Sequence, residues 1–298
     1  MTLYLALDIG GTKIAAGLVT PEGSVLRSAR VPTPLTGGSS ILDAALTLAR
    51  ETRTGQMAAA IGIGTGGQVD AARGVVVSAT DLLPGWAGTD VAGAFQEAFG
   101  LPCAVDNDVN ALAVGEARLG AGRGKSSVLF LALGTGVGGA WVQGGQVHHG
   151  ATWTGGEFGH LYLTASIDAP RQTLEDWASG PGLARTYWEL TGQTATGEEI
   201  ARAAALDPQG GAARAIMRTG EALGFGLASL ANALDPELIV VGGGLASLGD
   251  ALLSPARAVL ARCGLPGPAR CPVVPAALGA EASLIGAACL AMPGILSA

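Results

Sequence analysis

The sequence predicts an α/β fold made of two related halves. Apolar runs typical of strands open each half, at 3–9 and 126–133. Helical spacing of apolar residues follows in both, at 39–53 and again from 208 to 234. A chain of 298 residues is long enough for two domains with separate cores. Strands followed by helices in each half indicate mixed α/β architecture.

A repeated motif supports the two halves. LYLALDIGGTKIAAGLV and LFLALGTGVGGAWV each consist of an apolar strand, a tight Gly/Thr turn and a second strand. Gly10 and Gly134, which open the two turns, are separated by about one domain length. We therefore expect one such hairpin per domain, with the two hairpins facing each other across a cleft.

The remaining elements follow from local patterns. We expect strands at 3–9, 14–19, 24–31, 57–64, 74–79, 103–106, 126–133, 138–143 and 237–243. We expect helices at 39–53, 89–99, 108–120, from 174 through about 190, and from about 208 to 234. The uncharged segment from Ala282 to Ala298 is short for a membrane span and contains Pro293, so it predicts a buried terminal helix.

Composition excludes several classes of protein. Only 14% of the residues are charged and the net charge is −7, with no Lys/Arg run, which argues against a nucleic-acid partner. No cationic segment precedes the first apolar run and Asp8 interrupts that run, so we expect no signal peptide and no membrane partner. The four cysteines form no C-x-x-C pair, and we expect free thiols in a cytoplasmic protein.

The stretch LGTGVGG contains a G-x-G-x-x-G pattern formed by Gly134, Gly136 and Gly139. A dinucleotide-binding loop of this kind must lead into a helix, whose N-terminus holds the pyrophosphate. The residues that follow, AWVQGGQV, alternate as a strand does. The pattern therefore predicts a β-hairpin turn. The alternative function of a nicotinamide-dependent dehydrogenase would rest only on the G-x-G-x-x-G match, which this context does not support.

Gly-rich turns of this kind expose backbone N–H groups that can bind phosphate. Two such turns suit a nucleoside triphosphate with Mg²⁺, and Asp8 would hold the metal through water. A merely Gly-rich turn is the alternative for either hairpin taken by itself. The nucleotide-binding candidates in the two turns are Asp8, Gly10, Gly11, Thr12, Lys13, Gly134, Thr135 and Gly136.

A third glycine cluster lies at the end of an apolar strand, in ELIVVGGGLAS. Gly242, Gly243 and Gly244 leave bare backbone there, against which a flat adenine or ribose could lie. An ordinary strand–helix turn is the alternative interpretation.

Five motifs in order resemble those of the ROK family of sugar kinases and repressors. They are DIGGTK, VDNDVNALAVGE, LGTGVGG, GGEFGH and LDPELIVVGGG, and the similarity extends along nearly the whole chain. The resemblance implies two RNase-H-like (actin-like ATPase) domains with a sugar in the cleft between them. We expect a small N-terminal domain at 1–108 joined by a returning helix at 279–298, and a larger domain at 109–278.

The resemblance also implies ATP- and Mg²⁺-dependent phosphorylation of a hexose, most simply glucose at its 6-hydroxyl. By this resemblance, Asp108 would be the general base of the phosphorylation reaction. Substrate ligands by resemblance are Asn107, Glu157, His160 and Glu175, with Gly66 beside the sugar where relatives often have proline. Carboxylates accept hydrogen bonds from adjacent hydroxyls, and Asn or His supplies donors, so the set is chemically reasonable.

Structural roles compete with these assignments. Asp108 is well placed to be the N-cap of the helix at 108–120. Glu157 and Glu175 could be solvated acids, and His160 a packed loop residue. Trp86 could line a sugar face, but a core position suits it equally.

One departure from the family concerns zinc. Most relatives carry a cysteine cluster after the GH pair, whereas LYLTASIDAPRQT (161–173) contains no cysteine. We predict no structural zinc, which leaves the order of this segment open. Some relatives without zinc use polyphosphate, so polyphosphate is an alternative phosphoryl donor. A homodimer or homotetramer is expected from the resemblance.

Alternative functions remain within and outside the class. The chain could be a fructokinase, mannokinase or N-acetylhexosamine kinase of the same family. It could also be a weakly catalytic sugar-binding regulator that uses the same cleft.

Overall fold

A computed structural model describes residues 2–166 and 168–293 of the chain. The chain forms two compact units. Among the described residues, unit 1 contains 2–124, 142–155 and 277–293, and unit 2 contains 125–141, 156–166 and 168–276. Each unit has its own buried cluster of aliphatic side chains.

Unit 1 is built on a five-stranded mixed sheet with the order β3-β2-β1-β4-β7. Its strands are β1 (Tyr4–Ile9), β2 (Lys13–Val19), β3 (Val25–Pro32), β4 (Ala60–Thr65) and β7 (Cys103–Asn107). The first three pair antiparallel, whereas β4 and β7 run parallel to β1. β1 and β4 are buried almost throughout, as strands covered on both faces must be.

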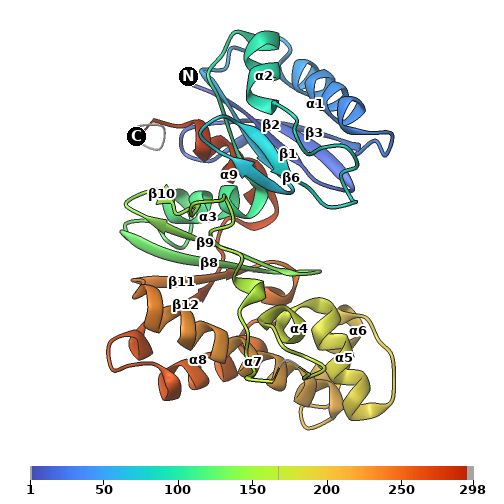
Figure 1. The fold of residues 1–298 in the computed structure, drawn as a ribbon, viewed down its shortest axis with the longest axis vertical. Helices are drawn as coiled ribbons and strands as arrows, with labels where there is room; N and C mark the ends of the chain where they lie inside the picture. The colour runs from blue at the N-terminus through green and yellow to red at the C-terminus, as the bar shows by residue number, and fades with distance from the viewer. Residues whose placement is uncertain (1, 167, 294–298) are drawn as a thin grey trace. The chain divides into compact units, whose positions relative to one another are not determined.

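Four helices belong to unit 1: α1 (Gly38–Arg53), α2 (Val91–Phe99), α3 (Asp108–Leu119) and α9 (Ala282–Ala291). Figure 1 shows α9, in red, beside the sheet, and it packs on β1, β4 and α3. Close packing requires glycine at one point, because a Cβ on Gly62 would lie 1.8 Å from the carbonyl oxygen of Ala287. The short hairpin of β5 (Gln68–Asp70) and β6 (Val75–Ser78) completes the unit.

A second five-stranded sheet has the order β10-β9-β8-β11-β12, which repeats the order of the first sheet position by position. Its strands are β8 (Ser127–Leu133), β9 (Val137–Gln143), β10 (Gln146–Val147), β11 (Leu238–Gly242) and β12 (Val273–Pro275). β11 runs parallel to β8 and β12. The two halves inferred from the repeated hairpin are therefore present as two sheets of one topology.

The helices of unit 2 pack against this sheet and against one another (Figure 1). They are α4 (Leu174–Ala178), α5 (Gly180–Thr191), α6 (Gly197–Leu206), α7 (Gly211–Leu234) and α8 (Asp250–Cys263). The core is formed by buried aliphatic residues of β8, β11, α7 and α8.

The strands and helices expected from the sequence are present with small shifts of their ends. Helices α6 and α8 and the short strands β5, β10 and β12 were not expected. α6 begins at a capping box, in which Thr196 and Glu199 exchange side-chain and backbone hydrogen bonds. Residues 294–298 of the expected terminal helix lie outside the described residues.

The units differ from the domain ranges that the sequence predicts. Residues 109–124 and 142–155 were assigned to the second domain, but they lie in unit 1. α3 belongs there because it packs mainly on α9, and a Cβ on Gly115 would meet Gly286 of that helix at 2.8 Å.

A buried carboxylate ties the C-terminal segment to α3. Glu116 is 1% exposed, and its Oε1 accepts hydrogen bonds from the N–H groups of Ala277 and Leu278, both at 2.9 Å. Its Oε2 accepts from Ala121 N–H at 2.8 Å. Charge-assisted bonds to three backbone donors satisfy the buried carboxylate, and they fix the chain at the point where it enters α9.

Glu116→Gln should lower the free energy of unfolding by about 1–3 kcal/mol, because the new NH₂ group faces a backbone donor that it cannot accept from. Urea denaturation measures the effect. Glu97→Gln, on the exposed face of α2, is the matched control and should change stability little. Equal stability of the Glu116 variant and the wild type would contradict the assigned contacts.

Candidate active site

The carboxyl ends of three neighbouring strands meet at one edge of the unit 1 sheet. In the parallel register, Asp8 of β1 pairs with Gly64 of β4, which pairs with Asp106 of β7. Ligand sites of open α/β sheets form at this edge, because loops and helix N-termini converge there. The turn that contains Gly10–Thr12 follows β1, and Asn107 and Asp108 follow at the end of β7.

Asn107, and not Asp108, is the N-cap of α3. Its Oδ1 accepts from the N–H groups of Val109 at 2.8 Å and Asn110 at 3.3 Å, and its Nδ2 donates to Gly67 O at 2.9 Å. Asp108 is the first residue of the helix, and its Oδ1 accepts from Val109 N–H at 2.9 Å. The capping role considered for Asp108 therefore belongs to its neighbour, and Asp108 keeps a second oxygen for other partners.

Two carboxylates interact at this edge. Burial, and secondly the negative charge of Asp8, raise the pKa of Asp108 to about 6. Burial also raises the pKa of Asp8, although Ser283 and Lys13 act in the opposite direction. Carboxylate oxygens are the ligands that Mg²⁺ prefers, and one or two of them with phosphate oxygens and water are enough for it. The donor set therefore fits a divalent cation.

The turn between β1 and β2 is closed by a hydrogen bond from Gly10 N–H to Lys13 O at 3.0 Å. Thr33 holds two carbonyl groups of this turn. Its hydroxyl donates to Gly10 O at 2.6 Å, and its N–H donates to Thr12 O at 3.1 Å. Within the described part of the chain, the N–H groups of Gly11 and Thr12 have no partner. Thr12 and Lys13 are exposed, so these donors and the Lys13 ammonium are available to an anion.

The equivalent turn of unit 2 is also closed by a backbone hydrogen bond from its first glycine, although this bond spans one residue fewer. Gly134 N–H donates to Gly136 O at 2.9 Å. The Gly134 carbonyl accepts from Gly180 N–H at 2.8 Å. Glu175, at the start of α4, accepts from Val137 N–H at 2.8 Å. A Cβ on Gly136 would lie 2.5 Å from Oε2 of Glu175, so a larger residue here would displace that carboxylate. Glu175 therefore lies on the turn, with Oε1 making no hydrogen bond to another described residue.

A cavity of about 960 Å³ opens beside this turn, entirely within unit 2. It brings Gly134 and Thr135 together with Gly243 and Gly244, although they are far apart in the sequence. No atom lies within 4 Å of the position that a Cβ on Gly134 or Gly244 would occupy. The space beside both glycines is therefore left open to a ligand, and the volume suits a nucleotide.

Two predicted cofactor residues do not line this cavity. Gly136 faces Glu175, and Gly242 is buried in β11, where a Cβ would meet the Phe130 ring at 3.0 Å. Glycine at 242 is therefore explained by packing against Phe130.

The other candidate substrate ligands lie in both units. Asn107, Asp108 and Gly66 belong to unit 1, whereas Glu157, His160 and Glu175 belong to unit 2. Glu157 precedes the short 3-10 helix Phe158–His160 and His160 ends it, and both side chains are exposed.

Gly66 and Trp86 belong to the structure around the end of β4. The Gly66 N–H donates to Ile9 O at 3.1 Å. Trp86 is fully buried in the core of unit 1, and its indole N–H donates to the Thr65 hydroxyl at 2.9 Å. Of the two roles considered for Trp86, the structure supports the core position.

The segment after His160 is held by protein contacts. Tyr162 and Thr173 form an antiparallel bridge, and Leu163 N–H donates to Gln172 O at 2.7 Å. Arg171 is 5% exposed and lies 4.3 Å above the Trp177 ring.

The Arg171 guanidinium makes two further contacts in this segment. It donates to the Thr186 hydroxyl at 2.7 Å and lies 3.2 Å from a carboxylate oxygen of Glu189. No group of three His, Cys, Asp or Glu side chains suited to a metal occurs in the part of the chain that the structure describes.

Long-range contacts at the site were not predicted from the sequence. His149, to which the sequence assigned no role, lies 2.7 Å from Asp106 across 43 positions of the chain. Thr196 and Gly197, from the unexpected helix α6, form one wall of the unit 2 cavity. No local pattern marks either contact, because both depend on how distant segments pack.

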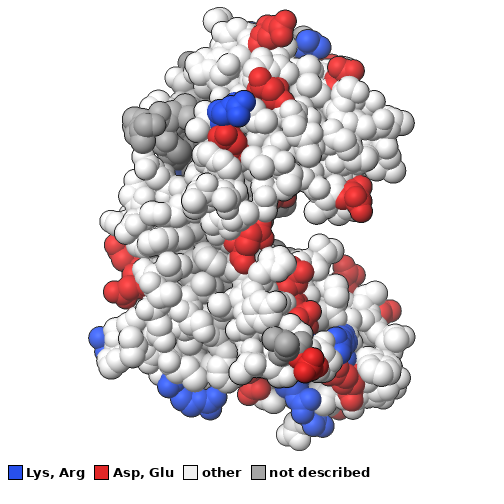
Figure 2. Space-filling model, viewed as in Figure 1, with Lys and Arg blue, Asp and Glu red and all other residues white. Residues whose placement is uncertain are grey.

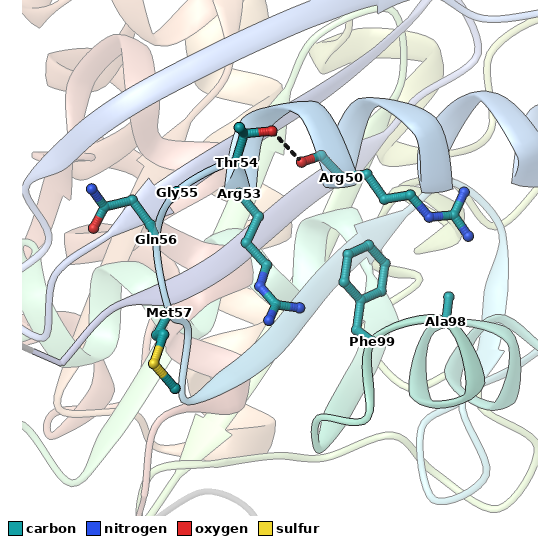
Figure 3. A pocket seen from close by; sticks show the side chains of 8 residues that line it. All are labelled: Arg50, Arg53, Thr54, Gly55, Gln56, Met57, Ala98 and Phe99. Atoms are coloured by element: carbon teal, nitrogen blue, oxygen red, sulfur yellow. Dashed lines mark hydrogen bonds between the residues drawn. The ribbon is translucent and has the colours of Figure 1, made fainter.

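A separate pocket of about 430 Å³ contains none of the candidate residues (Figure 3). Arg50 and Arg53, from the last turn of α1, flank the Phe99 ring at 5.9 and 5.6 Å from its centre. Cations at this end of a helix favourably face its free carbonyl groups, which explains both arginines structurally.

The surface carries few charges. On the face drawn in Figure 2, acidic and basic side chains are scattered singly or in small groups, without a broad basic patch. A search of residues 2–166 and 168–293 finds no helix of the length and hydropathy needed for a membrane span.

Arg171→Met should loosen the segment 161–173 while metal chelation leaves it unchanged, because its contacts run through the guanidinium. Hydrogen exchange at these amides measures the effect, and Arg218→Met, at an exposed position of α7, is the control. Stoichiometric zinc by elemental analysis, or faster exchange after chelation, would contradict the prediction.

Asp108→Asn should stabilise the protein near pH 8. The folded pKa of about 6 exceeds the ordinary value of 3.8, so protonation stabilises the native state as pH falls, and the charged form costs stability above about pH 6. The gain should be on the order of 1–2 kcal/mol at about pH 8 and should shrink towards about pH 4. Urea unfolding at both pH values measures it, with exposed Asp43→Asn as control. A gain independent of pH would refute the assigned pKa.

Comparison with known proteins identifies the family. The ROK family model matches residues 4–293. The glucokinase of Streptomyces coelicolor is 34% identical, with 98% of each chain covered. Among solved structures, the ROK hexokinase of Thermus thermophilus is 36% identical with a TM-score of 0.81, covering 97% of this chain and 98% of its own.

A ROK family glucokinase of Streptomyces griseus, crystallised in complex with glucose and AMPPNP, is 33% identical with a TM-score of 0.80. The alignment covers 97% of this chain and 99% of that one. These matches are consistent with the two sheets of one topology and with the two Gly/Thr hairpin turns. The chain therefore belongs to the ROK family, whose kinases have two actin-like ATPase domains.

Proposed function

We propose that this chain is a sugar kinase that transfers the γ-phosphoryl group of ATP to the 6-hydroxyl of a hexose, with glucose as the preferred substrate. The observation that carries the proposal is the half-buried Asp108 at the start of α3, whose pKa is raised to about 6. A general base works best when its pKa lies near the working pH. Glucokinase relatives at 33–34% identity support the substrate.

Asp108 accepts the proton of the attacking hydroxyl in this mechanism. Its Oδ1 is held by Val109 N–H, which leaves Oδ2 to face the substrate. The hydrogen bonds of Asn107 to Val109, Asn110 and Gly67 prevent the turn from shifting during the reaction. Phosphoryl transfer depends mainly on positioning and on neutralising charge, so a rigid turn is what the reaction needs.

The sugar is bound, in this proposal, by groups of complementary hydrogen-bonding character. Carboxylates of Glu157 and Glu175 accept from adjacent hydroxyls, while Asn107 and His160 donate. Glu175 carries out a second task, since it holds the Val137 N–H of the unit 2 turn at 2.8 Å. Gly66 keeps the backbone near the substrate free of a side chain.

The phosphates of ATP are bound by the two turns. Gly11 and Thr12 present free N–H groups, and Lys13 adds a positive charge. Gly134 and Thr135 line the unit 2 cavity, where Gly243 and Gly244 accommodate the nucleoside. When bound, Mg²⁺ neutralises phosphate charge, and Asp8 would hold it through water.

Purified protein should release ADP when glucose, ATP and Mg²⁺ are supplied together. Asp108→Asn should lower kcat by about 10²- to 10⁴-fold, because proton transfer to a positioned base contributes that much. Glucose affinity, measured by calorimetry, should survive the substitution. Asp43→Asn is the control and should keep full activity.

A panel of glucose, fructose, mannose and N-acetylhexosamines, each with ATP or polyphosphate, separates the alternatives. Higher kcat/KM for another sugar would replace glucose as substrate. Sugar binding without turnover on any donor would favour a weakly catalytic regulator and contradict the kinase. Full activity of Asp108→Asn would remove Asp108 as the base.

We further propose that the protein is cytoplasmic and forms a homodimer or homotetramer, as the family resemblance implies. Light scattering of the purified protein measures the assembly. No partner beyond hexose, ATP and Mg²⁺ is required for the proposed reaction.

A further inference from the structure

We infer that His149 is a positioning residue, which acts through its hydrogen bond to Asp106 to hold the turn that carries Asn107 and Asp108. The inference rests on the proposed function, in which Asp108 is the base. His149 Nε2 and Asp106 Oδ2 are 2.7 Å apart, and the two side chains are 23% and 6% exposed. Both residues lie in unit 1.

Asp106 is the central acceptor of the strand–helix turn. Its Oδ1 accepts from the N–H of Asn107 at 2.7 Å and from Nδ2 of Asn110 at 2.8 Å. One carboxylate therefore holds the residue before Asp108 and a residue in the first turn of α3. The direction of this carboxylate determines where both donors lie, and among the described residues His149 alone hydrogen-bonds to Oδ2.

His149 is itself held on both sides. The Trp153 ring meets it edge-on, with ring centres 5.4 Å apart. Gly155 N–H donates to His149 O at 2.7 Å, which closes the backbone from 149 to 155 into a compact loop. Trp153 has a positive φ of 63°, an unfavourable conformation for a large side chain. Such strain persists only where the surroundings impose it, often at functional sites.

The partly buried contact with Asp106 favours the protonated form of His149. Burial opposes the protonated imidazole, but the hydrogen bond and the charge of Asp106 outweigh it and raise the pKa of His149. A charge-assisted bond of this kind is shorter and stronger than a neutral one. His148, the adjacent residue, is exposed and hydrogen-bonds to the Gln143 side chain instead.

A cavity of about 380 Å³ lies against the pair and is lined by Ala71, Ala72, Val147, Trp153 and Leu290 as well as by the pair itself. Gln146 also lines this cavity, and the His149 imidazole is the hydrogen-bond partner of Asp106 Oδ2 among the described residues. Truncation of His149 would enlarge this cavity by the volume of the ring. Free imidazole should then be able to enter and bind Asp106.

The kinetic test compares His149→Ala with His148→Ala. We expect kcat with glucose and ATP to fall about 10- to 100-fold in His149→Ala, since small displacements of reacting groups have effects of this size. KM for ATP should stay unchanged, because the nucleotide contacts lie elsewhere. Added imidazole should restore kcat in His149→Ala but not in Asp106→Ala, which lacks the carboxylate. His148→Ala should behave as wild type.

A second measurement does not require activity. In ¹⁵N NMR spectra, His149→Ala should shift the amide signal of Asn107, which donates to Asp106, and imidazole should move it back. If the wild type is inactive but this shift occurs, the proposed function fails while the positioning role stands.

The opposite results would overturn the inference. Wild-type kcat in His149→Ala would show that the pair does not position the base. A loss of kcat that imidazole does not restore, with the Asn107 amide unmoved, would assign His149 a general structural role instead.

Discussion

The burial of two carboxylates, Asp8 and Asp108, at one edge of the unit 1 sheet is the constraint on which the site depends. The parallel pairing of β1, β4 and β7 brings the ends of β1 and β7 to one edge of the sheet. Burial at that edge raises the pKa of both carboxylates, and the charge of Asp8 raises the pKa of Asp108 further. A cation or a proton-donating hydroxyl beside these carboxylates would stabilise their charged forms. A kinase active site supplies both.

Hydrogen bonds hold the backbone around Asp108 in place. Asn107 caps α3, Asp106 binds the amide of Asn107, and Glu116 fixes the other end of the helix to the segment before α9. Asp106 and Glu116 are buried and Asn107 is partly buried, and the hydrogen bonds of these three side chains favour one conformation of the turn. The site thus combines an unfavourable electrostatic element with a well-determined frame.

Much of the fold could be predicted because it repeats. The hairpins that contain Gly10 and Gly134 have the same pattern, and the two sheets have the same strand order. Helix α6 was missed although the capping box of Thr196 and Glu199 and the helix-favouring residues that follow it were usable signals. The compact unit that contains α3 extends past the predicted domain boundary because α3 packs on α9, and no local pattern reveals this contact.

The candidate site was predictable only where motifs mark it. Glycines at 134, 243 and 244 line one cavity, as their positions after strands suggested, whereas Gly242 serves packing. The contacts of Arg171 with Trp177 and of His149 with Asp106 could not be predicted from the sequence. They form because the loops between the partners bring them together. A polar or charged residue in a loop gives no local sequence signal of what it will contact.

The most direct measurement of the central claim is a crystal structure with glucose, Mg²⁺ and a non-hydrolysable ATP analogue. The account requires a free oxygen of Asp108 at hydrogen-bonding distance, about 2.6–3.2 Å, from the sugar 6-hydroxyl. It also requires the cation on the Asp8 side of the phosphates. A sugar bound with no hydroxyl near Asp108 would contradict it.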